Sequence, residues 1–540
     1  MWKSICCVLA CVFVPAVSGF SADSLKGEVR KPAHWDRVEA VAQKIDAQFA
    51  ARWQADGLTA APATDDSEFV RRVWLDLAGR IPRAADIRDF LDDKTPDKRR
   101  RLIDRLIESP LFVVHQTNVW RRMLLPEADA DREQQLDTAG FEAWFRDRLR
   151  ERRSYAEIVL ELLSLRNLES PAMNAPATEV ENPARRAPSP LAFYQAKQRK
   201  PENMTAAVSR LFLGVRLECA QCHDHPFDTW KRERFWEMAA FFNEDPATAR
   251  TIAIPETKIT VAATFLNGAK PDFSRHATEN ARETLAHWIV AAENPYFSKA
   301  AANRLWSAFF GVGLVEPADD FTAANPASHP EVLTLLAETF AAENYDVRFL
   351  TRVITATRVY QLSSRRTDAT QDHPRSYARM TIRGLTPPQL FDSIAQAIGY
   401  RQPFDPDRNL DEVDPVRKEF LETFVNTTDS PVDRPTSLLG VLTLMNGSPL
   451  NNREAALTEG APPSNRLLNR TIEAITAAPF LDDPARIEAL FLVTVSRLPR
   501  PAEQDRFQAH LKSGSLGNPQ SPLHDILWAL LNSAEFMTNH

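Results

Sequence analysis

Apolar residues recur every three or four positions along much of the chain, with polar residues between them. Val38, Val41, Ile45 and Phe49 form the first such stripe, and this spacing predicts a helix over residues 35–55. The stripes are interrupted at proline and glycine, as expected where helices end in turns. Further helices are predicted over 67–81, 84–91, 96–108, 111–124, 141–149, 155–163, 204–215 and 230–242.

Strand signals are confined to a short stretch near the middle of the chain. Residues 252–254 and 258–265, bounded by Pro255 and by Asn267-Gly268, predict a small β-hairpin. Helical spacing then resumes over 299–310, 346–360, 386–398, 487–496, 502–511 and 523–531. The predicted fold is mainly α: helical domains over 35–245 and 275–540, a hairpin connector over 246–274, and long Pro-rich loops, chiefly over 166–190 and 401–436.

Three helix starts carry capping signals. Thr386 and Gln389 have the spacing of a capping box, and so do Ser328 and Glu331. Asp228 stands before an aromatic helix and is predicted to be its N-cap.

The first 22 residues have the pattern of an export signal. Lys3 supplies a short positive region, residues 5–20 are almost wholly apolar, and small residues over 16–19 offer a cleavage point. We therefore expect a periplasmic or secreted protein with no membrane span once residues 1–22 are removed. Three of the five cysteines leave with this segment, so the mature chain keeps only Cys219 and Cys222.

Composition limits the classes of function. A net charge of −7 and a pI near 6.0 argue against nucleic acid as a partner. Two remaining cysteines exclude a disulfide-rich scaffold. The sequence has no Ser-His-Asp signature, phosphate loop or dinucleotide fingerprint, so it assigns no enzyme class.

The main candidate for chemistry is Cys219-Ala220-Gln221-Cys222-His223, which has the C-x-x-C-H form of a haem c attachment site. Two thiols three positions apart can add to the two vinyl groups of one porphyrin, and the adjoining imidazole can then bind the iron. Candidates for a second axial ligand are Met204, Met238, His287 and His329.

The same stretch allows two other interpretations. With His225, the residues Cys219, Cys222 and His223 supply two thiolates and two imidazoles, a ligand set that suits a structural zinc ion. Alternatively, the two thiols form a disulfide in an oxidising compartment, and the protein holds neither haem nor metal. Either alternative would make the protein a scaffold or binding module.

A second polar cluster lies between two predicted helices of the later half. It contains Asp319, Asp320, Asn325 and His329, which are candidates for binding a cation or a substrate. Hydrogen bonding within the loop is the alternative interpretation of the same residues.

Longer motifs resemble known families. CAQCHDHPFDTW, followed by WEMAAFF, resembles an exported cytochrome-c-like domain of planctomycete-type bacteria. Four further stretches resemble the companion domain that usually follows it: NRLWSAFFGVGLVEPADDFTAANPASHPEVL, TRVYQLSS, SRLPRPAEQ and LLNSAEFMTNH. Both are domains of unknown function. The resemblance implies haem at Cys219, Cys222 and His223, a redox partner, and an association with an exported sulfatase-like protein in polysaccharide breakdown.

Overall fold

The structure is a computed structural model of the 540-residue chain. It describes residues 35–130, 136–165, 188–225, 228–245, 248–273, 280–403, 413–423, 470–513 and 521–540. The predicted signal peptide over 1–22 lies outside the described residues, as do most of the Pro-rich loop predicted over 166–190 and much of the one over 401–436.

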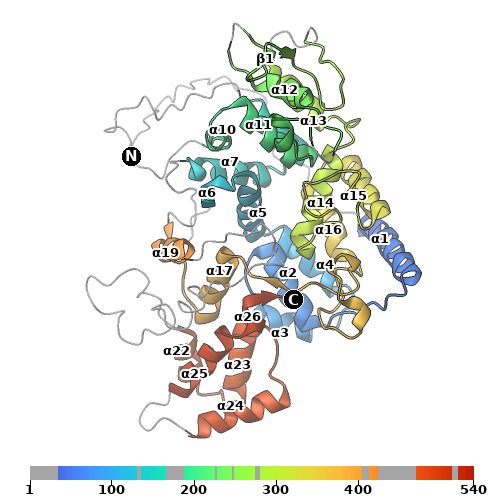
Figure 1. The fold of residues 1–540 in the computed structure, drawn as a ribbon. Coiled ribbons are helices and arrows are strands. Elements are labelled where there is room, and N and C mark those ends of the chain that lie inside the picture. Colours follow the sequence, from blue (N-terminus) through green and yellow to red (C-terminus); the bar gives the residue numbers. More distant parts are fainter. Residues whose placement is uncertain are drawn as a thin grey trace, which may run out of the picture.

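The prediction of a mainly α fold is confirmed, and helices dominate the described residues (Figure 1). In the first half the helices are α1 (Trp35–Ala55), α2 (Asp66–Ala78), α3 (Ala84–Asp92), α4 (Lys98–Ile107), α5 (Pro110–Leu124), α6 (Glu127–Ala130), α7 (Thr138–Arg150), α8 (Tyr155–Leu163), α10 (Leu191–Ala196), α11 (Pro201–Val208), the π-helix η3 (Ser209–Leu213), the 3-10 turn η4 (Glu218–Gln221), α12 (Arg232–Ala239) and the 3-10 turn η5 (Ala240–Phe242).

The second half continues in the same way. Its helices are α13 (Ala281–Val290), α14 (Phe297–Phe310), α15 (Pro330–Ala342), α16 (Val347–Ala356), the 3-10 turns η6 (Ala369–Gln371) and η7 (Pro374–Ser376), α17 (Pro387–Ile398), α19 (Pro415–Thr423), α22 (Arg470–Ala477), α23 (Asp483–Val495), α24 (Pro501–Ser513), α25 (Ser521–Leu531) and α26 (Ala534–Met537).

Two short antiparallel strand pairs interrupt the helices. Strands β1 (Thr251–Ala253) and β2 (Thr260–Ala262) form the predicted hairpin, with Ile252 opposite Val261. The second pair joins β3 (Arg383–Gly384) to β4 (Thr538–Asn539) at the end of the chain. This second pair was not predicted, because two-residue strands carry no alternation that a sequence could show.

The largest hydrophobic core is built from both halves of the chain. Its members lie between Val38 and Met380, with Leu492 added from near the end of the chain. Helix α1 contributes to this core by packing against α15 and α16 (Figure 1). The side chain of Asp46 in α1 also accepts the N–H of Arg358 at 2.9 Å. The predicted domain boundary over 246–274 remains a prediction, but this core does not divide there.

A second core holds the end of the chain together. It gathers apolar residues of α17, α19, α22, α23 and α25, and Leu75 and Ile81 from the region of α2 join it. Helix α2 therefore touches both cores. Arg71 in α2 fixes this contact by donating to the carbonyl oxygens of Thr494 at 3.0 Å and Phe536 at 2.7 Å.

One of the three predicted caps is confirmed and two are wrong. Thr386 and Gln389 form the capping box of α17. Helix α15 begins after His329 without a side-chain cap, and the hydroxyl of Ser328 donates to the carbonyl of Leu314 instead. Asp228 is not the N-cap of α12: its carboxylate accepts the nearby N–H of Thr229, and the helix begins after Lys231.

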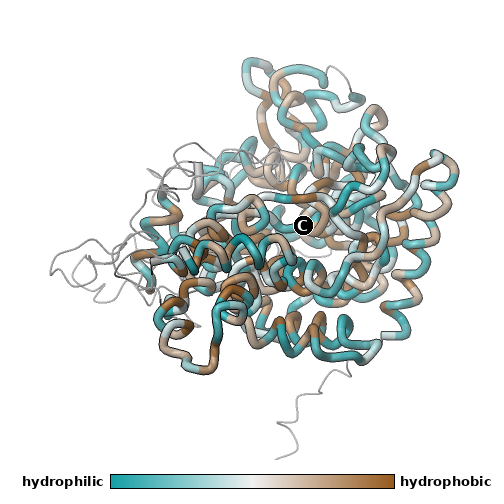
Figure 2. Tube along the Cα trace, turned by 90° about the horizontal axis from the view of Figure 1, so that it is seen from below, coloured by the Kyte–Doolittle hydropathy of each residue, from teal (hydrophilic) through white to brown (hydrophobic). Residues whose placement is uncertain are grey.

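None of the described helices combines the length and the apolar content needed to cross a membrane. Hydrophobic and hydrophilic residues alternate along the chain trace instead (Figure 2). This is the distribution of helices that bury one face against a core and leave the other in water.

Candidate functional site

The C-x-x-C-H stretch lies in a short turn between two buried helical segments. After η3 the chain passes Leu217, which is fully buried, and forms the 3-10 turn η4. Ala220 is buried under this turn, and its N–H donates to the carbonyl of Leu217 at 2.9 Å. Burying the small Ala220 places the residues on either side of it at the surface.

Both cysteines are exposed free thiols in the structure, and His223 is exposed beside them. The Nδ1 atom of His223 lies 2.8 Å from the carbonyl oxygen of Asp224. A carbonyl can only accept a hydrogen bond, so this contact requires the proton on Nδ1. The lone pair is then on Nε2, the atom that a metal would bind.

Helix α12 holds the turn in place. The carbonyl of Gln221 accepts from the indole Nε1 of Trp236 at 3.0 Å and from Nε of Arg232 at 3.3 Å. The carboxylate of Asp224 accepts the backbone N–H of Arg232 at 3.0 Å and Nζ of Lys231 at 2.9 Å. These two hydrogen bonds, the backbone one first, hold the pKa of Asp224 below its usual value. The backbone around the thiols is therefore anchored although the thiols are exposed.

The aromatic residues that follow the motif serve the core. Phe235, Trp236, Phe241 and Phe242 are all at most 4% exposed.

Among the described residues, no group of three or more His, Cys, Asp or Glu side chains could hold a metal ion. His225 is only partly buried, and its backbone N–H donates to the carbonyl of Trp230 at 2.8 Å.

The second polar cluster is distributed over three environments. Asn325 donates through Nδ2 to the carbonyls of Asp320 at 3.0 Å and Glu316 at 3.2 Å, as expected for loop hydrogen bonding. His329 is 5% exposed, and its ring centroid lies 4.4 Å from that of Phe49. Burial lowers the pKa of His329 to about 4, so its ring is neutral at pH 7.

Asp319 belongs to a separate group of charges. It is 4% exposed and accepts from Arg216 through Nε at 2.9 Å and Nη2 at 2.7 Å. Nε of Arg210 donates to its other oxygen, and Nη2 of Arg304 lies 3.9 Å away. Burial alone would raise the pKa of Asp319, but the hydrogen bond and charge of Arg210, together with Arg304 and Arg216, more than offset it and lower the pKa.

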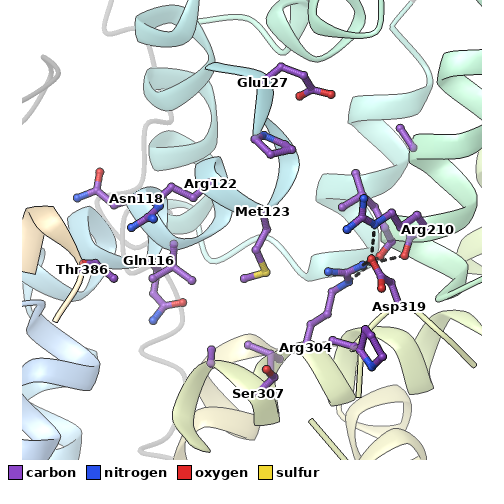
Figure 3. Close-up of a pocket in the computed structure, with 18 of the residues that line it drawn as sticks. Gln116, Asn118, Arg122, Met123, Glu127, Arg210, Arg304, Ser307, Asp319 and Thr386 are labelled. Carbon is purple, nitrogen blue, oxygen red and sulfur yellow. Dashed lines mark hydrogen bonds and ion pairs between the residues drawn. The ribbon is translucent and has the colours of Figure 1, made fainter. Parts of the chain in front are cut away.

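These charged residues line a cavity of about 760 Å³. Gln116, Asn118, Arg122 and Met123 of α5 face it from one side, and Arg210, Arg304 and Asp319 meet on the other (Figure 3). Glu218, which directly precedes Cys219, is also part of the lining.

Comparison with known families divides the chain into two matched segments. Residues 44–246 match the family described as PSCyt2, a protein of unknown function (DUF1549). Residues 281–420 match the family described as PSD1, a protein of unknown function (DUF1553). The two matches follow one another in this order along the chain. No curated protein and no solved structure matches the chain.

The two matched segments share the cavity. Arg210 and Arg216 belong to the DUF1549 segment, whereas Arg304 and Asp319 belong to the DUF1553 segment. The C-x-x-C-H stretch lies wholly in the DUF1549 segment, and Glu218, which directly precedes it, belongs to the cavity lining.

Sequence reasoning selected Asp319 but missed the arginines around it. Arg210 stands in an apolar helical stripe, and Arg304 lies 94 positions further on, so no local spacing relates the two. The one available signal was that each is a lone cation within an apolar segment, where an ion pair is needed to bury it.

Proposed function

We propose that the chain is an exported c-type haem protein. Cys219 and Cys222 would form the two thioether bonds, and His223 would bind the iron through Nε2. The observation that carries the proposal is the state of these three residues: two exposed thiols without a disulfide, beside an exposed imidazole whose Nδ1 is engaged by the carbonyl of Asp224. Metal-binding histidines commonly have their other ring nitrogen fixed in this way.

The proposed attachment chemistry balances without a further reactant. Each thiol adds across one vinyl double bond, with sulfur bonding to one carbon and hydrogen to the other, so no oxidant is needed. Haem c bound there would supply one-electron transfer. This is the reason to propose a redox partner.

The candidates for a second axial ligand differ in exposure. Met204, Met238 and His329 are each at most 5% exposed and lie inside the helical core. His287 on α13 is exposed. Exposure alone therefore favours His287 over the three buried candidates.

The location and the wider role belong to the same proposal. Residues 1–22 support export to the periplasm or the medium. The link to an exported sulfatase-like protein and to polysaccharide breakdown rests on the family resemblance alone.

A pyridine haemochrome spectrum tests the proposal. The full chain is expressed in a host that exports proteins and matures c-type cytochromes, alongside Cys219→Ala with Cys222→Ala, and His225→Ala. We expect a covalent haem signal in the wild type and in His225→Ala, and none in the double cysteine variant. His225 is the matched control, because the zinc alternative requires it and the haem proposal does not.

The other outcomes are equally definite. A wild type without covalent haem refutes the proposal. Stoichiometric zinc in that sample, lost in His225→Ala, would support the structural zinc site instead. Absence of both haem and zinc, with the two thiols unreactive until reduced, would support the disulfide.

A further inference from the structure

Three uncharged polar side chains that line the cavity have no hydrogen-bond partner among the described residues. They are the amides of Gln116 and Asn118 on α5 and the hydroxyl of Ser307 on α14 (Figure 3). Gln116 is the most informative of them, because it is only 5% exposed and yet its amide atoms are not sealed inside the core. A polar group buried without a partner is unfavourable, and native proteins contain few of them.

Helix α5 holds the amide of Gln116 at a fixed wall of the cavity. Gln116, Val119 and Met123 recur at three- and four-residue spacing, so they share one face of the helix, and all three line the cavity. The helix is itself packed against α2 and α7. The free amide therefore stands on a rigid element, which positions a binding group more precisely than a loop does.

The charged residues of the lining are largely engaged by other groups of the protein. Arg383 lies 2.9 Å from Asp76, and Lys197 lies 2.8 Å from Glu127. The arginines that surround Asp319 donate to its carboxylate or to backbone carbonyl groups. These ions offer a ligand no charge that lacks a partner.

The remaining ionisable residues of the lining agree with this. Arg122 has partners elsewhere in the protein, Oε2 of Glu316 accepts the N–H of Gly313 at 2.7 Å, and Glu218 is exposed to solvent. Burial lowers the pKa of His115 to about 4, so its ring is neutral at pH 7. The groups left for a ligand inside the described lining are therefore neutral amides and a hydroxyl, which both donate and accept hydrogen bonds.

We propose that the cavity binds an uncharged polar organic molecule whose hydrogen-bonding group pairs with the amide of Gln116. An amide presents an acceptor beside its N–H donors, so its complement carries a donor and an acceptor side by side. A carboxamide and a pair of adjacent hydroxyl groups both have this pattern. A charged group would be held more weakly, since a charge moved out of water without a counter-ion is costly.

The size and the apolar part of the cavity fit such a ligand. Its volume of about 760 Å³ is in the range of sites that hold small molecules. Val119 and Met123 lie on the same face of α5 as Gln116 and offer apolar surface to the rest of the ligand. The proposal does not rest on haem at Cys219 and Cys222.

The alternative is that the cavity holds only solvent, which hydrates the free amides. Gln116→Leu separates the two possibilities, because leucine is of similar size and removes both the donor and the acceptor. Gln116 bonds to no described group, so this substitution should leave the thermal midpoint unchanged or raise it while ligand binding falls. Gln54→Leu is the matched control, since it makes the same change at an exposed position of α1 outside the cavity lining.

Saturation-transfer NMR titrations of the full mature chain provide the measurement. Benzamide, benzoate and benzamidine share one shape but are neutral, negative and positive at pH 7, so they isolate the effect of charge. A cyclohexanediol with adjacent cis hydroxyl groups, compared with cyclohexanol, tests the hydroxyl pair. We expect benzamide or the diol to bind saturably, and benzoate and benzamidine to bind at least about fivefold more weakly than benzamide or the diol. Gln116→Leu should weaken the bound probe by about tenfold, which corresponds to about 1.4 kcal/mol, and Gln54→Leu should leave its affinity unchanged.

The pattern of binding decides the proposal. Preference for benzamide identifies the ligand's group as a carboxamide, and preference for the diol identifies it as a hydroxyl pair. The proposal is overturned if no uncharged probe binds saturably, if a charged analogue binds as tightly, or if Gln116→Leu keeps the wild-type affinity. A lower thermal midpoint in Gln116→Leu, or its failure to fold, would show that the amide serves the fold and would overturn the proposal as well.

Discussion

Asp76→Asn should cost about 3–5 kcal/mol of unfolding free energy, the range expected when one partner of a buried ion pair is removed. Asp76 is 6% exposed and accepts from Nη2 of Arg383 at 2.9 Å, from the Tyr360 hydroxyl at 2.8 Å and from Nδ2 of Asn539 at 2.7 Å. These partners come from three remote segments that all meet α2. An amide at position 76 leaves Arg383, itself 7% exposed, without its counter-ion.

The pair need not be strongly stabilising for this substitution to be costly. Burial raises the pKa of Asp76 even though Arg383 opposes the shift, which means that taking the carboxylate out of water outweighs its attraction to the guanidinium. The loss in Asp76→Asn arises from an uncompensated Arg383. The double variant Asp76→Leu with Arg383→Met removes both charges of this pair, so it should recover part of the loss.

Urea unfolding at pH 7, followed by tryptophan fluorescence, measures these differences. Asp372→Asn is the matched control, because the Arg366–Asp372 pair is as close as 2.7 Å, against 2.9 Å for Arg383–Asp76, but has side chains 56% and 58% exposed. Its substitution should cost less than about 1 kcal/mol. If Asp76→Asn costs no more than Asp372→Asn, or if the double variant is less stable than Asp76→Asn, the reasoning is refuted.

Two further predictions concern single positions. Burial lowers the pKa of His329 to about 4. The unfolded chain, with a His pKa near 6.5, takes up the proton first as the pH falls, so stability should decline from pH 6.5 towards pH 4. His329→Gln should flatten that decline by up to about 3 kcal/mol, measured as urea midpoints across the pH range; an unchanged slope would count against it. Gly79 has φ +72°, and a Cβ there would lie 2.5 Å from Nδ1 of His115. Gly79→Ala should cost about 2 kcal/mol or more, against about 1 kcal/mol for Gly57→Ala, where φ is +66° and a Cβ meets nothing within 4 Å; equal thermal shifts would contradict this.

The local parts of the fold could be predicted because their causes are local. The stripe of Val38, Ile45 and Phe49 gave helix α1 with its observed bounds, and the hairpin followed from Pro255 and the alternation on either side of it. Caps were less predictable, because a hydroxyl at the correct spacing has other acceptors. Ser328 illustrates this, since the carbonyl of Leu314 takes its hydrogen bond.

The candidate site also has one part with a local cause and one part without. The residues of the C-x-x-C-H stretch are contiguous, so the sequence alone could propose them as a site. Which ring nitrogen of His223 carries the proton depends on the contact with the carbonyl of Asp224, which spacing does not specify. The group of charges around Asp319 has no contiguous signature. Arg210 lies in η3, Arg304 in α14, and Arg216 and Asp319 in loops, and tertiary packing brings them together. The sequence offered Asp319 as a polar residue without a role, and only the fold supplied the three cations that explain it.

These contacts give a physical reason for both matched segments to occur in one chain. Residues 44–246 contribute Arg210 and Arg216, and residues 281–420 contribute Asp319, so neither segment alone contains this carboxylate together with the two guanidiniums that donate to it. The larger core also needs both segments, because α1 of the first packs on α15 and α16 of the second. Cutting the chain between the segments would expose apolar surface on both pieces and leave Asp319 buried beside Arg304 alone, 3.9 Å away. The two segments are therefore expected to fold, and to form the cavity, only when both are present.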